Sequence, residues 1–215
     1  MPKQKLKLLF AAWEYGPLAK VGGLADVAAS LPLQLRRKFD IDARIVIPGH
    51  KTAIAKAKDT NPVGDSFRAK FRNREVSIIL TEAEGTDIPV YLVDAPEFFN
   101  RDGIYGQRNG TDYEDSFERS FTFCEGALRL PIVIDWIPDI IHVNEWQTCM
   151  IPAFLKCRRI RKDSPYAETG SLLTIHNLPY QGEYPLEYAE DLALDKRCFK
   201  LDKLDYHGKL NLMKL

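Results

Sequence analysis

The sequence has no excess charge and no long apolar run, and each absence excludes a class of protein. Its 30 Lys and Arg residues are balanced by 30 Asp and Glu residues, whereas a nucleic-acid-binding domain usually has a basic face and a high pI. No apolar run approaches the roughly 20 residues that a transmembrane helix needs. We therefore expect neither nucleic acid nor a membrane among the partners of this protein.

Closely spaced cysteines are also missing. The four cysteines are scattered and form no C-x-x-C pair: Cys124, Cys149, Cys157 and Cys198. In a chain of 215 residues, this pattern is typical neither of a disulfide framework nor of a zinc site. Cys124 and Cys149 lie in apolar stretches, where buried free thiols are common. The cysteine pattern therefore favours a reducing compartment.

The chain has no internal repeat, low-complexity tract or obvious interdomain linker. Its length and its 45% hydrophobic residues fit one large domain with a sizeable core. The N-terminus resembles a signal peptide only faintly, because charges interrupt its apolar residues and no small-residue cleavage pattern follows. We interpret it as a first strand.

The start of the chain predicts a βαβ unit. The continuous apolar run Leu6–Trp13 is typical of a strand buried on both faces. Apolar residues follow at helical spacing from Leu24 to Leu35, with cations at the end of the helix, and Ala43–Pro48 predicts a second strand. A right-handed crossover between the two strands implies a parallel sheet.

The middle of the chain interrupts this alternation and then resumes it. Three segments joined by turns predict a meander or hairpin on the α/β core: Asp65–Phe71, Val76–Thr81 and Ile88–Val93. We expect a long loop over residues 95–112, and long loops in compact domains tend to be either functional or disordered. The pattern then predicts a helix over Asp115–Leu130 ended by Pro131, a strand over Asp139–Val143, a helix over Glu145–Arg161 and a strand over Ser171–His176. These elements predict one doubly wound, mostly parallel α/β domain.

The last part of the sequence is less regular. Pro179–Leu204 is polar and aromatic-rich, with weak helical signals. Lys209–Leu215 predicts the start of an apolar helix that has no C-terminal cap. We therefore expect the chain to stop within a helix.

Three segments follow predicted strands directly, and ligands bind at such positions in open parallel sheets. In the first, Lys20 precedes Gly22 and Gly23, and a helix begins at once. Glycines let backbone amides approach a ligand, a helix N-terminus favours an anion, and a lysine adds a mobile charge suited to phosphate. Asp26 lies in the first helical turn and can reach toward the same site. The spacing fits equally a simple Gly-Gly turn with Lys20 and Asp26 in solvent.

This first segment does not match the common nucleotide-binding loops. Neither Gly-x-Gly-x-x-Gly nor Gly-Lys-Ser/Thr is present, so we do not expect a nucleotide cofactor bound in the usual Rossmann manner. The other two segments are His142–Thr148 and Thr174–Gly182. Most single histidines are structural, and His176 is the better candidate for a site because it lies at the end of a strand.

The three segments resemble, in order, motifs of bacterial glycogen synthases and plant starch synthases. Lys20–Val27 resembles their Lys-x-Gly-Gly-Leu signature, and His142–Trp146 resembles their His-x-His-Asp-Trp segment. Thr174–Gly182 resembles their Thr-x-His-Asn-x-x-Tyr-Gln-Gly segment. Tyr91–Pro96 and the loop that contains Tyr105 also match. The resemblance extends over essentially the whole chain.

The resemblance implies a GT-B glycosyltransferase, in which two Rossmann-like domains face each other across a cleft. Residues 1–215 correspond to the N-terminal, acceptor-side domain, and the C-terminal donor-binding domain would be a partner absent from this chain. The implied reaction transfers glucose from ADP-glucose or UDP-glucose to the non-reducing 4-hydroxyl of an α-1,4-glucan, with retention and without a metal ion or other cofactor. We expect the isolated chain to have negligible activity. The implied location is the cytoplasm, or the plastid in a plant.

The resemblance also implies roles for individual residues. Lys20 would face the donor diphosphate, with the backbone of Gly22 and Gly23 approaching it, and a lysine is suited to stabilising a departing diphosphate. Catalytic roles would fall to His176, whose backbone carbonyl would face the anomeric carbon, and to Asp26 beside the sugar. Acceptor and sugar contacts are implied for a further set of residues: Tyr105, Glu145, Asn177 and Gln181.

Two residues depart from the family pattern. Asn144 replaces the second His of His-x-His-Asp-Trp, and Glu145 replaces its Asp, which keeps the charge on a longer arm. The role carried over to Glu145 therefore stays open. Two other functions also stay open, a non-catalytic glucan-binding module and a related GT-B glucosyltransferase with another acceptor.

Overall fold

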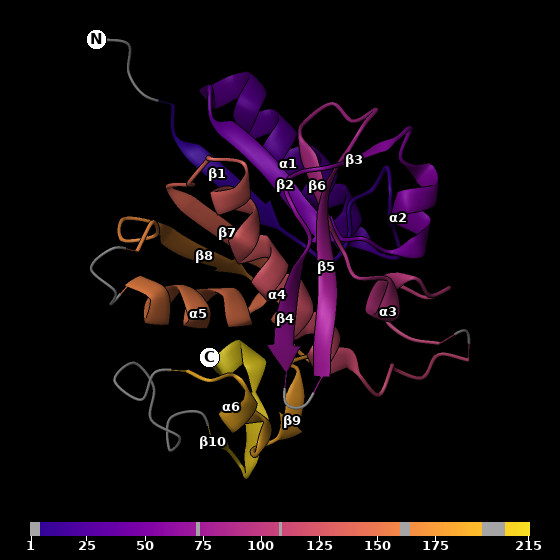
Figure 1. The fold of residues 1–215 in the computed structure, drawn as a ribbon, viewed down its shortest axis with the longest axis vertical. Helices are drawn as coiled ribbons and strands as arrows, with labels where there is room; N and C mark the ends of the chain where they lie inside the picture. Colours follow the sequence, from indigo (N-terminus) through magenta and orange to yellow (C-terminus); the bar gives the residue numbers. More distant parts are fainter. Residues whose placement is uncertain (1–4, 72–73, 108, 160–163, 195–204) are drawn as a thin grey trace.

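A mostly parallel sheet lies at the centre of the fold (Figure 1). The computed structural model describes residues 5–71, 74–107, 109–159, 164–194 and 205–215. Within them the sheet has eight strands, in the order β3-β5-β6-β2-β1-β7-β8, with β4 paired to β5. The bounds are β1 Lys7–Ala11, β2 Asp42–Pro48, β3 Thr60–Pro62, β4 Phe67–Phe71, β5 Arg74–Ala83, β6 Val90–Asp94, β7 Ile140–Asn144 and β8 Gly170–Thr174.

The parallel part of the sheet confirms the predicted βαβ unit. Strand β1 pairs in parallel with β2 on one side and with β7 on the other. Helix α1 (Gly23–Phe39) connects β1 to β2, and the outer pairs β2–β6 and β7–β8 are parallel too. Leu9, Phe10 and Ala11 are fully buried because β1 lies in the middle of the sheet, which explains the continuous apolar run.

The antiparallel part of the sheet confirms the predicted meander. Strand β5 pairs in antiparallel fashion with β3, β4 and β6. Strand β3 was not predicted from the sequence. It is a three-residue edge strand that ends in Pro62, and so short a segment has no readable apolar alternation.

Five α-helices accompany α1 in the described residues, and α4 differs from its prediction. Their bounds are α2 Lys51–Lys56, α3 Pro96–Phe99, α4 Ser116–Val133, α5 Met150–Arg159 and α6 Tyr188–Asp191. The prediction that Pro131 ends α4 is wrong, because the helix continues to Val133. The Ile134 N–H donates to the Leu130 carbonyl at 3.1 Å, so the helical hydrogen bonding resumes beyond the proline.

The region after β7 also differs from its prediction of one long helix from Glu145. Glu145 has a φ of 65°, and a residue in that region cannot begin an α-helix. A 3-10 helix, Trp146–Thr148, follows it, and α5 starts only at Met150. The predicted end at Arg161 lies outside the described residues, as do Cys198 and the end of the Pro179–Leu204 segment.

The predicted C-terminal helix is replaced by a small sheet. Strands β9 (Glu183–Pro185), β10 (Asp205–Tyr206) and β11 (Lys209–Asn211) pair in the order β10-β11-β9, and a 3-10 helix, Leu212–Lys214, follows. Leu210, Asn211 and Leu212 are all buried, so the segment has no amphipathic helical pattern, and the strand Lys209–Asn211 is set by its antiparallel pairing with Glu183–Pro185. This sheet lies beyond α5 and the end of β4 (Figure 1). None of the helices in the described part of the chain has the length and apolar character to span a membrane.

Candidate functional site

A cavity of about 980 Å³ opens where the segments after β1, β7 and β8 come together. The chain leaves β1 toward β2 on one side and returns through β7 on the other. The carboxyl ends of strands at such a switch point form the usual ligand crevice of an open α/β sheet. Each of the three segments selected from the sequence contributes to the lining, with Gly22 and Gly23 from the first, Glu145 from the second and His176, Asn177 and Gln181 from the third.

Glu14 organises the loop that follows β1. The side chain is almost fully buried, and its Oε2 accepts the N–H of Val21 at 2.5 Å and the N–H of Gly22 at 2.9 Å. Its Oε1 accepts the hydroxyl of Tyr105 at 2.5 Å. The Gly22 amide expected to face a ligand is therefore bound by a carboxylate of the protein itself. Gly23 begins α1, and amides of a first helical turn have no acceptor within the helix.

Tyr105 closes the cavity from the long loop before α4. Burial raises the pKa of its hydroxyl, and the hydrogen bond to Glu14 raises it further. The phenol therefore stays protonated at neutral pH and donates to the carboxylate. The predicted long loop over residues 95–112 thus places Tyr105, one of the predicted acceptor residues, on the cavity wall.

Glu145 organises the loop that follows β8 in a similar way. Its Oε1 accepts the N–H of His176 and, at 2.8 Å, the N–H of Asn177. Its own N–H donates to the Thr174 carbonyl at 3.1 Å. The φ of 65° at Glu145 is unfavourable for a residue with a side chain, and these contacts hold it there.

The ring of His176 is held by Asn144, the residue that departs from the family motif. Asn144 Nδ2 donates to the Ala11 carbonyl at 3.2 Å, which directs Oδ1 toward His176 Nε2 at 3.0 Å. Nε2 of His176 is therefore the donor in this contact. His142 lies nearby, with its Nε2 2.7 Å from the Thr174 hydroxyl. Burial and the proximity of His176 both lower the pKa of His142, which favours its neutral form.

Comparison with known proteins identifies the family. The starch synthase catalytic domain model matches residues 7–215. The chain belongs to the starch synthase catalytic domain family. Glycogen synthase of Geotalea daltonii is 40% identical over 218 residues, covering 97% of this chain and 43% of that protein. Glycogen synthase 2 of Geobacter sulfurreducens is 38% identical over 210 residues, with the same coverage.

A solved structure supports the family assignment at the level of the fold. The catalytic domain of starch synthase IV from Arabidopsis thaliana, bound to ADP and acarbose, matches with a TM-score of 0.78 and 24% identity. The match covers 97% of this chain and 42% of that one. The predicted Rossmann-like α/β class of a GT-B enzyme is therefore confirmed. The chain spans less than half the length of these relatives.

Two predicted site residues of this family member lie outside the cavity lining. Lys20 Nζ and Asp26 Oδ1 form an ion pair at 2.6 Å, with side chains 48% and 65% exposed. They flank the Gly22-Gly23 turn but are not among the residues that line the cavity. Their roles at the donor stay predictions.

Gln181 and its neighbour Gly182 fit closely against the cavity wall. Gln181 Oε1 accepts the Asn211 Nδ2 amide at 2.7 Å. Gly182 has a φ of 66°, and a Cβ there would lie 2.5 Å from the ring of Trp146. Only glycine combines this backbone with so close an approach.

Two residues that line the cavity, Glu14 and Arg119, were not predicted from the sequence. Glu14 directly follows the first strand, and a charged residue there was the available signal. Arg119 had none, because its loop partners are known only from the tertiary structure. In the described part of the chain, no group of three or more His, Cys, Asp or Glu side chains is arranged to hold a metal ion.

Proposed function

We propose that this chain is the N-terminal, acceptor-side domain of a glycogen or starch synthase. The complete enzyme would transfer glucose from ADP-glucose or UDP-glucose to the non-reducing 4-hydroxyl of an α-1,4-glucan, with retention. The observation that carries the proposal is the cavity at the switch point, which joins residues of the family's Gly-Gly loop, His-Asn loop and Tyr105 loop. The proposed partners are the nucleotide sugar, the glucan and a C-terminal GT-B domain.

The donor would bind at the N-terminus of α1. Lys20 would face the diphosphate, and the Gly23 amide would approach it, since Gly22 is already engaged by Glu14. A cation at a helix N-terminus stabilises negative charge that develops on a leaving diphosphate. Lys20 would then exchange its exposed partner Asp26 for the phosphate, which leaves Asp26 free beside the sugar and acceptor.

The anomeric carbon would face the His176 loop. In the proposed reaction the backbone carbonyl of His176 faces the positive charge that develops at the anomeric carbon. The hold of Glu145 and Asn144 on the His176 amide and ring supports this role, because a fixed dipole does not have to reorganise during the reaction.

The glucan would occupy the aromatic side of the cavity. Three aromatic residues line it near Gln181: Trp146, Tyr180 and Tyr184. Tyr180 is 63% exposed, which leaves a ring available to pack on a sugar. Tyr105, Glu145, Asn177 and Gln181 would contribute the polar contacts of this side.

We propose further that the reaction needs no cofactor and no metal ion, and that the enzyme works in the cytoplasm, or in the plastid of a plant. For metal independence, we expect the activity to survive EDTA, and a loss of activity in EDTA that Mg²⁺ restores would contradict it.

Fluorescent tagging of the full-length protein in its source cell tests the proposed location.

A chimera tests the function directly. The chain replaces the matching segment of Geotalea daltonii glycogen synthase, and incorporation of labelled glucose from ADP-glucose and UDP-glucose into glycogen is measured. We expect elongation by the chimera and negligible elongation by the isolated chain or by the remaining part of the relative. A folded chimera that is inactive with both donors would contradict the proposal, and binding of maltoheptaose by such a chimera would favour a glucan-binding module.

A further inference from the structure

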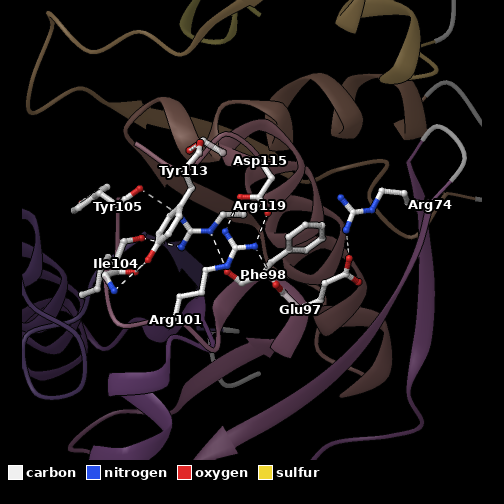
Figure 2. Close-up of polar contacts among 11 residues, drawn as sticks. Arg74, Glu97, Phe98, Arg101, Ile104, Tyr105, Tyr113, Asp115 and Arg119 are labelled. Atoms are coloured by element: carbon white, nitrogen blue, oxygen red, sulfur yellow. Dashed lines mark hydrogen bonds and ion pairs between the residues drawn. The ribbon is translucent and has the colours of Figure 1, made fainter. Parts of the chain in front are cut away.

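Arg119 lies at the start of α4 with its side chain only 1% exposed, and its guanidinium reaches into the loop that carries Tyr105 (Figure 2). Its Nε donates to the Phe98 carbonyl at 3.1 Å, and its Nη2 donates to the Ile104 carbonyl at 2.8 Å. Its Nη1 donates to the carbonyl of Tyr105 itself at 3.4 Å. One planar group therefore connects both ends of the segment between residues 98 and 105.

The charge of Arg119 is surrounded by aromatic rings rather than by a bonded carboxylate. The guanidinium carbon lies 4.6 Å from the ring centroid of Tyr113 and 5.5 Å from that of Trp13. Burial lowers the pKa of Arg119 to about 10, so the group is still protonated at neutral pH. Its three guanidinium hydrogen bonds go to backbone carbonyls of the segment between residues 98 and 105, which suits a role in fixing the backbone.

A second arginine takes the nearby carboxylate. Arg101 Nη1 donates to Asp115 Oδ1 at 2.7 Å and Nη2 donates to Oδ2 at 2.5 Å, a bidentate pair of well-defined geometry. This pair ties the middle of the same loop to the residue that precedes α4 (Figure 2). Asp115 is thereby occupied by Arg101, and Arg119 remains available for the three carbonyls.

The backbone position that Arg119 fixes determines where the Tyr105 hydroxyl lies. That hydroxyl donates to Glu14 Oε1 at 2.5 Å, and Oε2 of the same carboxylate accepts the amides of Val21 and Gly22. We propose that Arg119 is a positioning residue, which acts through Tyr105 and Glu14 to hold the Gly-Gly loop at the cavity. The consequence for glucosyl transfer rests on the proposed function, whereas the mechanical coupling does not.

Hydrogen exchange at individual amides, followed by NMR on the ¹⁵N-labelled chain, tests the coupling. Val21 and Gly22 are exposed residues, so protection of their amides reports the hydrogen bonds to Glu14. Lysine keeps the charge of Arg119 but lacks the planar fork. We expect Arg119→Lys to accelerate exchange at Val21 and Gly22 by about tenfold.

The second glutamate-bound loop is the internal control. The amides of His176 and Asn177 are bound by Glu145, and we expect Arg119→Lys to leave their exchange within about twofold of the original rate. Equal acceleration at both loops, or no acceleration at either, would overturn the proposal. Arg129→Lys is the matched variant, because Arg129 is an exposed residue of the same helix, and it should change neither loop.

Tyr105→Phe keeps the test decisive if Arg119→Lys does not fold. Loss of the hydroxyl should accelerate exchange at Val21 and Gly22 in the same way, and the double variant should add nothing further, as expected for residues that act in one chain of contacts. Unchanged exchange at these amides in Tyr105→Phe would refute the coupling. In the active chimera, Arg119→Lys should raise KM for the glucan or donor; a chimera with no activity would refute the function while the exchange result stands.

Discussion

Two loops border the cavity, and a buried glutamate holds each of them by two backbone amides. Glu14 binds the amides of Val21 and Gly22 after β1, and Glu145 binds those of His176 and Asn177 beyond β8. The loops differ in their support. Glu14 has a third donor in Tyr105, whereas Glu145 sits on an unfavourable backbone conformation with a φ of 65°.

This difference separates two ways of fixing a site residue. The Glu14 loop is cross-linked to a distant segment, because Tyr105 belongs to the long loop before α4 and depends on Arg119. The Glu145 loop depends on a locally strained residue between β7 and the 3-10 helix, and the N–H of this glutamate also donates to the Thr174 carbonyl at the end of β8. Removal of a contact in the Glu14 loop should therefore affect more distant residues than removal of a contact in the Glu145 loop.

The largest effect is expected from Glu14→Ala, which leaves the amides of Val21 and Gly22 and the Tyr105 hydroxyl without their acceptor. Each lost hydrogen bond to a charged group costs about 1.5 kcal/mol or less where water can enter, so we expect the free energy of unfolding to fall by about 3 kcal/mol. Urea denaturation measures it. Glu14→Gln keeps one acceptor oxygen and should lose about half as much. A loss below about 1 kcal/mol in Glu14→Ala would show that water replaces the carboxylate.

A smaller loss of about 2 kcal/mol is expected for Glu145→Ala, because only two amides lose their acceptor. Here glycine is the informative control. Glu145→Gly removes the backbone strain as well and should be about 1 kcal/mol more stable than Glu145→Ala. At position 14, which has no positive φ, the same exchange should instead be unfavourable. Equal stability of the Ala and Gly variants at position 145 would argue against strain there.

Two buried histidines, His50 and His142, should make the stability of the protein depend on pH to different extents. The Nε2 of His50 lies 3.0 Å from the Trp13 carbonyl, and burial lowers the pKa of His50 to about 3. Burial lowers the pKa of His142 on β7 as well. Because the unfolded chain binds the proton first, stability is lost as the pH falls below about 6.5, by about 1.4 kcal/mol per unit for a group that stays neutral in the fold. For His50 this loss continues to about pH 3.

Urea unfolding across pH 7.5 to 4.5 measures the slope. We expect His50→Gln to flatten it by about 1.4 kcal/mol per pH unit, and His142→Gln to flatten it less, since His142 is less completely buried than His50. A slope that His50→Gln leaves unchanged would mean that His50 takes up a proton in the folded state.

The smallest effect on stability is expected from Lys20→Met, because its ion pair with Asp26 is exposed. Exposed pairs contribute about 0.5 kcal/mol. In the chimera, however, the same change should lower kcat/KM for the donor by about 2 kcal/mol of transition-state stabilisation. Lys5→Met is the control, since it removes another exposed pair, with Asp40, far from the cavity. An unaltered kcat/KM would remove Lys20 from the donor site.

The sequence predicted most strands of this protein because their signals are local. The apolar run at Leu8–Ala11 reports burial on both faces of a central strand, and the Gly22-Gly23 pair marks the start of α1. The predicted secondary structure was wrong where a segment is shaped by contacts with residues far away in the chain. Lys209–Asn211 forms a strand because it pairs with Glu183–Pro185, and α5 starts late because Glu145 turns to bind the His176 loop.

The sequence by itself determined the fold class, the order of the motifs and the identity of the loops that follow the strands, because apolar periodicity and glycine placement act over short stretches of chain. Only the tertiary structure decided which hydrogen bonds hold those loops in place. The acceptors of the Gly22 and His176 amides, and the arginine that holds Tyr105, come from segments far apart in the chain. Their contacts form only when the sheet brings β1, β7 and β8 together, since a hydrogen bond depends on distance and direction in space.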